Sequence, residues 1–334
     1  MVSIDQPTDK QQIEDLWKIS FGDSDDFIRL FFDRVYKDEQ TLVIRQHDQV
    51  VSALQILPYE MAFCGATVSA GYICGVCTLP SERGKGLMSK LMQQAIEVMK
   101  QRDYAIAILI PATPQLFNLY RRFDFTDIFY YALEDIQAEK PATVHSHLIS
   151  VKVDINMQTI DSEYFTKSAT NMIPFATLYQ FYHSKQLERH DSILLTVSQF
   201  EIICQDRKLG GGEIWVAIVN EQLAGLALTD PISSNVLFIR EIMTDNAAIK
   251  RQLVQFILSH HHLQHARLRI PPAPSCSIPY GMAHILNKNQ MIDLYRSFHN
   301  PSPLPDFSKH DASSLTQQLL HCPNRYPYMN LMLD

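Results

Sequence analysis

The sequence predicts a mixed α/β fold that is present in two similar copies. Helical and strand-like hydrophobic patterns follow one another through residues 1–135, as expected when helices pack on a sheet. A basic, glycine-containing turn joins a strand to a helix at residues 78–86. The strand, polar turn and strand of residues 41–56 recur at residues 214–229. This recurrence indicates an internal repeat of one fold.

Length, charge and cysteine content narrow the class of protein. The chain has 334 residues, a length that favours about two domains. Its net charge of −7 argues against a nucleic-acid partner and mildly favours a cationic substrate. The N-terminus has no signal-like segment, and no run reaches the roughly 18 apolar residues of a membrane span. We therefore expect a cytoplasmic protein without membrane contact, and its six sparse cysteines fit reduced thiols.

Residues 1–30 are expected to form two helices joined by an acidic loop. Apolar residues recur at helical spacing from Ile13 to Ile19, and the pattern breaks at residues 21–26 before it resumes. The acidic residues around this loop have two interpretations: they help to attract an amine, or they form an N-cap and a solvated turn. These residues are Asp23, Asp25 and Asp26.

The remainder of the first copy is a series of strands interrupted by two helices. A hairpin is expected at residues 41–57 with its turn near His47 and Asp48, because two strand-like runs flank polar residues there. The other expected strands cover residues 60–64, 70–78, 104–110 and 128–133, and the expected helices cover residues 86–101 and 115–122. One face of the longer helix is apolar, so this helix should pack on the sheet.

The turn before the longer helix has the composition of an anion site. Four of the 11 glycines of the chain fall between residues 71 and 86. Gly84 and Gly86 permit left-handed backbone or a close approach of a ligand. Arg83 and Lys85 add positive charge beside the free N–H groups of a helix N-terminus. The pattern therefore predicts a site for phosphate groups.

The element order and three motifs resemble the Gcn5-related N-acetyltransferase (GNAT) superfamily over roughly residues 1–135. The motifs are Thr78-Leu79-Pro80, Arg83-x-x-Gly86-x-Met88 and Tyr120-Arg-Arg-Phe-Asp124-Phe125. Two residues depart from the family pattern: Met88 replaces a small residue and Asp124 replaces a glycine. In having a bulky aliphatic residue at Met88, the chain is similar to the enhanced-intracellular-survival type of N-acetyltransferase.

The resemblance implies that acetyl-CoA is the cosubstrate and that no metal is needed. It implies that backbone N–H groups around residues 76–78 bind the thioester carbonyl and the pantetheine arm. The implied cofactor-binding residues are Val76, Cys77, Thr78, Arg83, Gly84, Lys85, Gly86, Leu87, Met88 and Ser89. Tyr120 would be the general acid, since a phenol of pKa about 10 remains protonated at neutral pH. The terminal carboxylate of Asp334 would be the base if burial raises its pKa or if water relays the proton.

The second copy is expected to be degenerate. It covers residues 148–274, and residues 243–251 replace the phosphate turn with a glycine-free segment that contains Asp245. This half should therefore not hold coenzyme A. The expected domains are residues 1–137, 148–274 and 275–334. The last of these resembles a shortened sterol-carrier-like domain of the survival-type enzymes.

Two further signals have ordinary structural explanations beside functional ones. Cys74 and Cys77 have the spacing of a redox motif, but positions three apart on a strand face opposite sides, so we expect buried thiols. The histidines of residues 260–262 and His265 could bind zinc, or they could form an exposed helix end.

The sequence thus predicts an N-acetyltransferase that moves an acetyl group from acetyl-CoA to a primary amine. The amine is either a small polycation, such as an aminoglycoside or polyamine, or a lysine or N-terminus of a peptide. A non-catalytic acyl-CoA-binding or regulatory protein remains the alternative. A homo-oligomer is compatible with the resemblance, because survival-type relatives assemble as oligomers.

Overall fold

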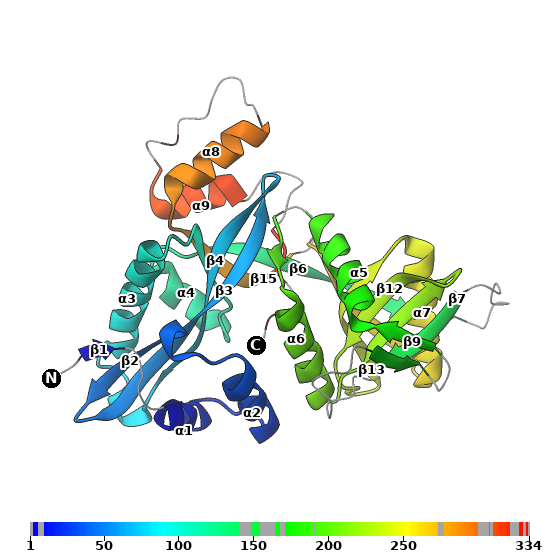
Figure 1. Ribbon diagram of the computed structural model, residues 1–334, viewed down its shortest axis with the longest axis horizontal. Coiled ribbons are helices and arrows are strands. Elements are labelled where there is room, and N and C mark those ends of the chain that lie inside the picture. The colour runs from blue at the N-terminus through cyan, green and yellow to red at the C-terminus, as the bar shows by residue number, and fades with distance from the viewer. Residues whose placement is uncertain are drawn as a thin grey trace. The chain divides into compact units, whose positions relative to one another are not determined.

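The structure is a computed structural model, and it divides the chain into two compact units that are not contiguous in sequence (Figure 1). It describes residues 3–5, 10–139, 148–153, 164–167, 171–189, 191–272, 277–299, 307, 310–320, 327–329 and 332. The first unit comprises Met1–Tyr130, His190–Ile193 and Pro279–Pro327, and the second comprises Tyr131–Arg189, Leu194–Ile278 and Tyr328–Asp334. The expected third domain, residues 275–334, is thus divided between the two units. Residues 279–327 belong to the first unit, and the rest belong to the second.

A mixed sheet forms the centre of the first unit. Its strands, in spatial order, are β1 (Ser3–Asp5), β2 (Thr41–Gln46), β3 (Gln49–Phe63), β4 (Ala66–Thr78), β5 (Ile106–Leu109), β15 (Ile278–Ile285) and the first part of β6 (Thr126–Gln137). β4 and β5 run parallel, whereas β2, β3 and β4 are antiparallel to one another. The short strand β10 (Ile193–Leu194) pairs with β3.

One strand is longer than the sequence predicts. The expected strand at residues 60–64 is not separate, because β3 runs without a break from Gln49 to Phe63. Pro58 interrupts the sequence pattern but pairs with Gly71 of β4, and the ladder continues to Phe63. The hairpin turn predicted at His47 and Asp48 is confirmed, and both residues have the positive φ that two-residue hairpin turns favour.

Four helices predicted for the first copy are present. They are α1 (Lys10–Ser20), α2 (Asp25–Arg34), α3 (Leu87–Gln101) and α4 (Pro114–Arg121). The apolar face of α3 joins strand residues in one core cluster that includes Leu91, Ile56 and Leu109. Two later helices, α8 (Lys288–His299) and α9 (Ala312–Leu320), also belong to the first unit. Short 3₁₀ helices lie at Asp38–Gln40 (η1) and Pro80–Glu82 (η2).

The second unit repeats the element order of the first. Its sheet contains the second part of β6, β14 (His265–Ile270), β13 (Val236–Thr244), β12 (Gln222–Thr229), β11 (Ile214–Val219) and β7 (Leu148–Val153). Its other elements are α5 (Phe175–Leu187), α6 (Val197–Leu209), α7 (Ala247–His260) and the strand pair β8 (Tyr164–Lys167) and β9 (Asn171–Pro174). The series β11, β12, β13, α7, β14 has two antiparallel pairs and one parallel pair, like β2, β3, β4, α3, β5. The internal repeat read from the sequence is therefore present in the topology.

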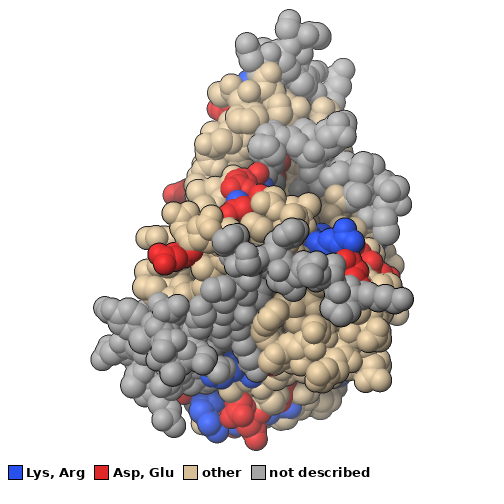
Figure 2. Space-filling view, turned by 90° about the vertical axis from the view of Figure 1, so that its right-hand side faces the viewer, with Lys and Arg blue, Asp and Glu red and all other residues tan. Residues whose placement is uncertain are grey.

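Helix length is relevant to membrane partners, and surface charge is relevant to nucleic-acid partners. No helix in the described part of the chain is long and apolar enough to cross a membrane. On the face shown in Figure 2, acidic and basic side chains of the described residues are scattered and intermingled.

Candidate active site

The pairing of β4 with β5 ends before β4 itself ends. Their parallel pairing runs from Ala70 opposite Ile106 to Ile73 opposite Leu109. β5 ends there, whereas β4 continues to Thr78. β5 therefore supplies no pairing partner for residues 74–78 of β4. An extended ligand can add to such an edge through backbone hydrogen bonds.

A bulge in β4 lies at this point of separation. The register with β3 shifts between Ala53 opposite Cys77 and Gln55 opposite Cys74, and Gly75 lies in the bulge with φ +58°. A Cβ at Gly75 would lie 1.9 Å from Gln55 Oε1 and 2.4 Å from the Trp17 ring. Only glycine fits this position, so the packing of α1 and β3 fixes the path of the β4 backbone.

Gln55 is an unusual residue beside the bulge. Its side chain is fully buried, and neither its amide oxygen nor its amide nitrogen has a hydrogen-bond partner among the described residues. Such buried amides are rare in native proteins. No pattern in the sequence indicates this feature, because Gln55 lies in an ordinary hairpin strand.

The acidic loop serves helix packing at the positions described. The Asp23 carboxylate accepts a hydrogen bond from Trp17 Nε1 at 2.7 Å. Ser24 is the N-cap of α2 and accepts from the Phe27 N–H, while Asp25 and Asp26 lie in the first turn of that helix. These contacts match the N-cap and turn interpretation of the loop.

The turn between β4 and α3 is exposed and basic. Arg83 Nε donates to the Thr78 carbonyl at 3.1 Å, so the turn folds back on the end of β4. Lys85 Nζ lies 2.9 Å from Glu82 Oε1, and this hydrogen bond lowers the pKa of the Glu82 carboxyl. Gly86 is the N-cap of α3 and contributes no side-chain cap. The first N–H groups of α3 are therefore left to an external acceptor.

The same position in the second unit is closed by the protein itself. Asn246 caps α7 by accepting the Ile249 N–H at 3.0 Å. Asp245 forms an ion pair with Lys185 at 3.1 Å. An anion at this helix end would meet the Asp245 carboxylate, which agrees with the expectation that the second copy holds no coenzyme A.

The predicted cofactor-binding residues fall into two groups in the structure. The exposed residues are Arg83, Gly84, Lys85 and Gly86, and the buried or half-buried residues are Val76, Cys77, Thr78, Leu87, Met88 and Ser89. The side chain of Leu87 is buried in the core cluster of α3, so Leu87 could meet a ligand only through its backbone, whereas the half-buried Met88 packs against this cluster. Burial raises the pKa of Cys77 to about 12, which keeps this thiol protonated.

Tyr120 lies near the end of α4 and is 6% exposed. Its ring packs against Phe125 with centroids 6.3 Å apart, inside the same core cluster as Leu87. Burial raises the pKa of Tyr120 to about 12. No described residue forms a hydrogen bond with the hydroxyl. The phenol is therefore protonated at neutral pH and has an uncommitted O–H donor.

The backbone conformation at Asp124 explains why aspartate can replace the glycine of the family pattern. Its φ is +62°, the left-handed conformation for which glycine is the usual residue and which aspartate tolerates better than most others. His284 Nδ1 lies 3.1 Å from the Asp124 carbonyl. The predicted base, Asp334, lies outside the described residues.

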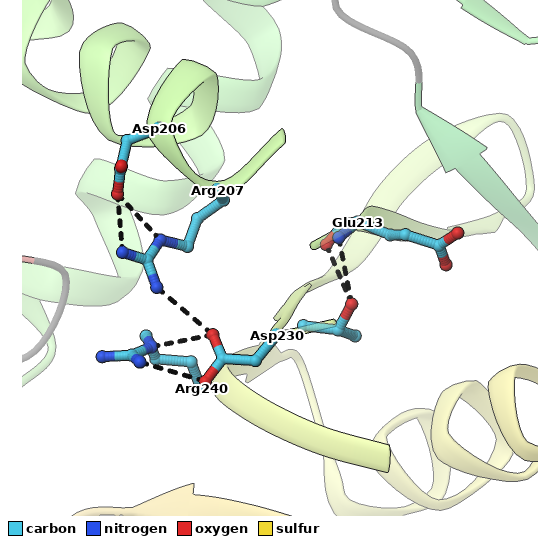
Figure 3. Close-up of polar contacts among 6 residues, drawn as sticks. Asp206, Arg207, Glu213, Asp230 and Arg240 are labelled. Carbon is cyan, nitrogen blue, oxygen red and sulfur yellow. Dashed lines mark hydrogen bonds and ion pairs between the residues drawn. The ribbon is translucent and has the colours of Figure 1, made fainter. Parts of the chain in front are cut away.

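Charged side chains of the second unit pair with one another. Arg207 contacts Asp206 and Asp230, and Asp230 also accepts two hydrogen bonds from Arg240 (Figure 3). This network links α6 to the end of β12 and the middle of β13. Sequence reasoning missed the network, because its members are up to 34 positions apart and carry no local motif.

A second buried ion pair lies elsewhere in this unit. Arg189 binds both oxygens of Glu241 at 2.9 and 3.1 Å, and its guanidinium lies 4.4 Å from the Tyr328 ring centroid. Although burial opposes the charged form, the Glu241 carboxylate raises the pKa of Arg189.

The histidine segment after α7 makes contacts with carboxylates. His261 Nε2 lies 2.8 Å from Glu213 Oε2, and His265 Nε2 lies 3.0 Å from Asp135 Oδ1. Trp215 Nε1 donates to the same Glu213 oxygen at 3.0 Å. In the part of the chain that the structure describes, no three metal-ligating side chains come together. Cys74 and Cys77 are free thiols.

Comparison with known proteins identifies the fold. Residues 5–128 match the family model described as an acetyltransferase (GNAT) domain. No curated protein matches the chain. Among solved structures, a conserved protein of unknown function from Enterococcus faecalis V583 is similar with a TM-score of 0.70 at 16% identity, covering 88% of this chain and 74% of that one.

Two further solved structures carry informative names. A GCN5-related N-acetyltransferase from Kribbella flavida has a TM-score of 0.64 at 17% identity, over 87% of this chain and 73% of that one. Eis1 from Mycobacterium abscessus has a TM-score of 0.63 at 10% identity, over 88% and 76%. Identities this low establish similarity of fold alone. The chain therefore has a GNAT-like fold, and its residues 5–128 match the GNAT acetyltransferase domain.

Proposed function

We propose that the protein is an N-acetyltransferase that uses acetyl-CoA to acetylate a primary amine. The observation that carries this proposal is the combination of an end of β4 that has no β5 partner on one edge with an α3 N-terminus that lacks a side-chain cap. An extended pantetheine arm can pair with the first, and pyrophosphate can bind the second. Both features lie on one continuous segment, residues 74–86.

Acetyl transfer to an amine has three chemical requirements. The amine must be neutral, the oxyanion of the tetrahedral intermediate must be stabilised, and the departing thiolate must receive a proton. We assign stabilisation of the oxyanion to backbone N–H groups around residues 76–78. We assign the proton to Tyr120, whose hydroxyl is protonated at neutral pH. Tyr120 gives its proton to sulfur as the carbon–sulfur bond breaks.

We assign the base to the Asp334 carboxylate, which the resemblance to the survival-type enzymes implies for a chain that ends at this residue. An α-carboxyl group has an unperturbed pKa of about 3.5, so it accepts a proton from an ammonium ion efficiently only after burial raises its pKa or through a water relay. The survival-type assignment and the sterol-carrier-like tail also belong to this proposal. They rest on the sequence resemblance, with which the fold similarity to Eis1 is compatible.

Mass spectrometry of a reaction with a panel of amines tests the proposal. The panel should contain a polyamine, an aminoglycoside and a lysine peptide, and the protein should keep an untagged C-terminus. We expect an acetylated product with at least one amine and a large rate loss in Tyr120→Phe, while acetyl-CoA binding persists. Tyr36→Phe is the matched control, because the Tyr36 hydroxyl donates to Asp38 in the same unit.

The alternative function is a non-catalytic acyl-CoA-binding protein. The burial of Tyr120 in an apolar cluster favours it, since a hydroxyl so enclosed also serves packing. Binding of acetyl-CoA without acetylation of any amine would support this alternative. Absence of binding would contradict both functions.

A further inference from the structure

A pocket of about 800 Å³ lies in the first unit at the C-terminal end of α3. It is lined by Lys100 of α3, by Asp124 after α4, and by residues 284–289 at the end of β15 and the start of α8. The basic turn lies at the opposite end of α3. Helix geometry puts Leu87 and Lys100 about 20 Å apart, so this pocket is separate from the proposed acyl-CoA site.

The walls of the pocket combine apolar and polar side chains. Ile96, Tyr104, Phe123 and Leu286 line it, and all four also pack at the edge of the core cluster. Its volume falls in the range of roughly 300–1,000 Å³ that is typical of small-molecule sites. The pocket is thus suited to a ligand with an apolar or aromatic body.

His284 lines this pocket and carries a hydrogen-bond acceptor. The residue is 6% exposed, and its Nδ1 lies 3.1 Å from the Asp124 carbonyl oxygen. A carbonyl oxygen only accepts, so Nδ1 carries the proton. Burial lowers the pKa of His284, which favours the neutral ring with a free lone pair on Nε2. Nε2 has no hydrogen-bond partner among the described residues.

The start of α8 supplies positive potential. Asn287 Oδ1 accepts the Gln290 N–H at 3.2 Å, and the first residues of the helix, Lys288 and Asn289, line the pocket. The side chains of Lys288 and Arg122 form no ion pair with a described residue, whereas Lys100 is paired with Glu97 at 2.9 Å.

The carboxylates of the pocket limit the charge of a ligand. Glu97, Asp103 and Asp124 line the same pocket as the basic side chains. A ligand with several negative charges would be repelled by these carboxylates, while a single anionic group can lie at the start of α8. The charge pattern therefore fits one anionic head.

We propose that this pocket binds a small organic anion with one carboxylate or phosphate head, an apolar or aromatic body and a neutral N–H or O–H donor. The head lies at the N-terminus of α8 beside Lys288 and Arg122. The body packs on Phe123 and Tyr104, and the donor bonds to His284 Nε2.

Calorimetry with four probes tests this assignment on the full chain. 4-Aminobenzoate has the carboxylate, the ring and the donor, and benzoate lacks the donor. AMP has a phosphate head on an aromatic base, and adenosine lacks the head. We expect 4-aminobenzoate, AMP or both to bind, and the partner probe of each to bind roughly tenfold more weakly, the usual effect of one lost charged or buried hydrogen bond.

Single substitutions test whether the probes bind in this pocket. Lys288→Ala should weaken binding of the anionic probes roughly tenfold, and Lys37→Ala, an exposed lysine of the same unit, should leave it unchanged. His284→Phe keeps an aromatic ring against Phe125 and should abolish the preference for 4-aminobenzoate over benzoate. Binding of AMP alone would identify a phosphate ligand, and binding of 4-aminobenzoate alone a carboxylate ligand.

Three results would overturn the proposal. They are no binding of any probe at millimolar concentration, binding that is unaffected by Lys288→Ala, and displacement of every bound probe by coenzyme A. None of these readouts requires acetyl transfer, so a failed acetylation assay leaves this test intact.

Discussion

Replacing Gly75 by alanine should lower the stability of the first unit more than replacing the exposed Gly84 does. Gly75 has φ +58°, and an alanine Cβ would lie 1.9 Å from Gln55 Oε1 and 2.4 Å from the Trp17 ring. The left-handed conformation costs a non-glycine residue about 1–2 kcal/mol. Overpacking a dense core costs about 1–3 kcal/mol more. We expect Gly75→Ala to lower the free energy of unfolding by about 2–5 kcal/mol.

Gly84→Ala is the matched control for this substitution. Gly84 has φ +79°, but no atom lies within 4 Å of the position that its Cβ would occupy. Only the backbone cost of about 1–2 kcal/mol applies. The difference between the two variants therefore isolates the packing of α1 and β3 against the bulge.

Urea unfolding followed by tryptophan fluorescence measures both variants. The chain has two tryptophans, so a Trp215→Phe background makes Trp17 the only reporter and restricts the signal to the first unit. Equal losses of stability in Gly75→Ala and Gly84→Ala would refute the packing argument. Gly75→Ala should also weaken acetyl-CoA binding, because the bulge sets the path of residues 74–78.

Three further predictions concern single residues. Asp124→Gly should raise thermal stability slightly, by about 1 kcal/mol at most, because the φ of +62° at Asp124 suits glycine; a melting scan checks this, and a marked fall would show that the aspartate side chain stabilises the turn. Arg189→Ala should cost about 3–5 kcal/mol, because it leaves Glu241 charged and buried; chemical denaturation checks it, and a loss below about 1 kcal/mol would contradict it. The pKa of Tyr120 is raised to about 12, so the folded state holds this proton while the unfolded state releases it near pH 10. Stability is then fully present below pH 10 and declines as the pH rises toward 12, and unfolding measured from pH 9 to 12 should show a smaller decline in Tyr120→Phe than in the wild type.

Local sequence patterns predict most of the helices, strands and turns of the first unit. The turn at His47 and Asp48, the helix from Leu87 to Gln101 and the buried strand before Pro111 are each set by neighbouring residues, so periodicity and turn chemistry predict them. The left-handed conformation of Asp124 was not predicted, although Asp124 stands where the motif around Tyr120 has a glycine in the family. These features depend on short-range steric preferences.

Long-range pairings were beyond the reach of the sequence. β15 lies beside β5 in the first unit, although 168 positions separate Leu109 from the start of β15 at Ile278. His284 therefore enters the first unit without a local signal, and the ion pair of Arg189 with Glu241 in the second unit has no local signal either. The unpartnered amide of Gln55 was equally hidden, because hydrogen-bond satisfaction depends on which side chains meet in three dimensions.

Calorimetric binding of acetyl-CoA and of S-acetylpantetheine, which lacks the pyrophosphate and the nucleotide, tests the central claim most directly. We predict that the wild type binds acetyl-CoA and that Lys85→Ala and Arg83→Ala each weaken this binding roughly tenfold, because each loses a charge-assisted contact with phosphate. The weaker binding of S-acetylpantetheine should be unchanged in both variants. Failure of the wild type to bind acetyl-CoA, or equal losses for both thioesters, would contradict the assignment of the α3 N-terminus as the phosphate site.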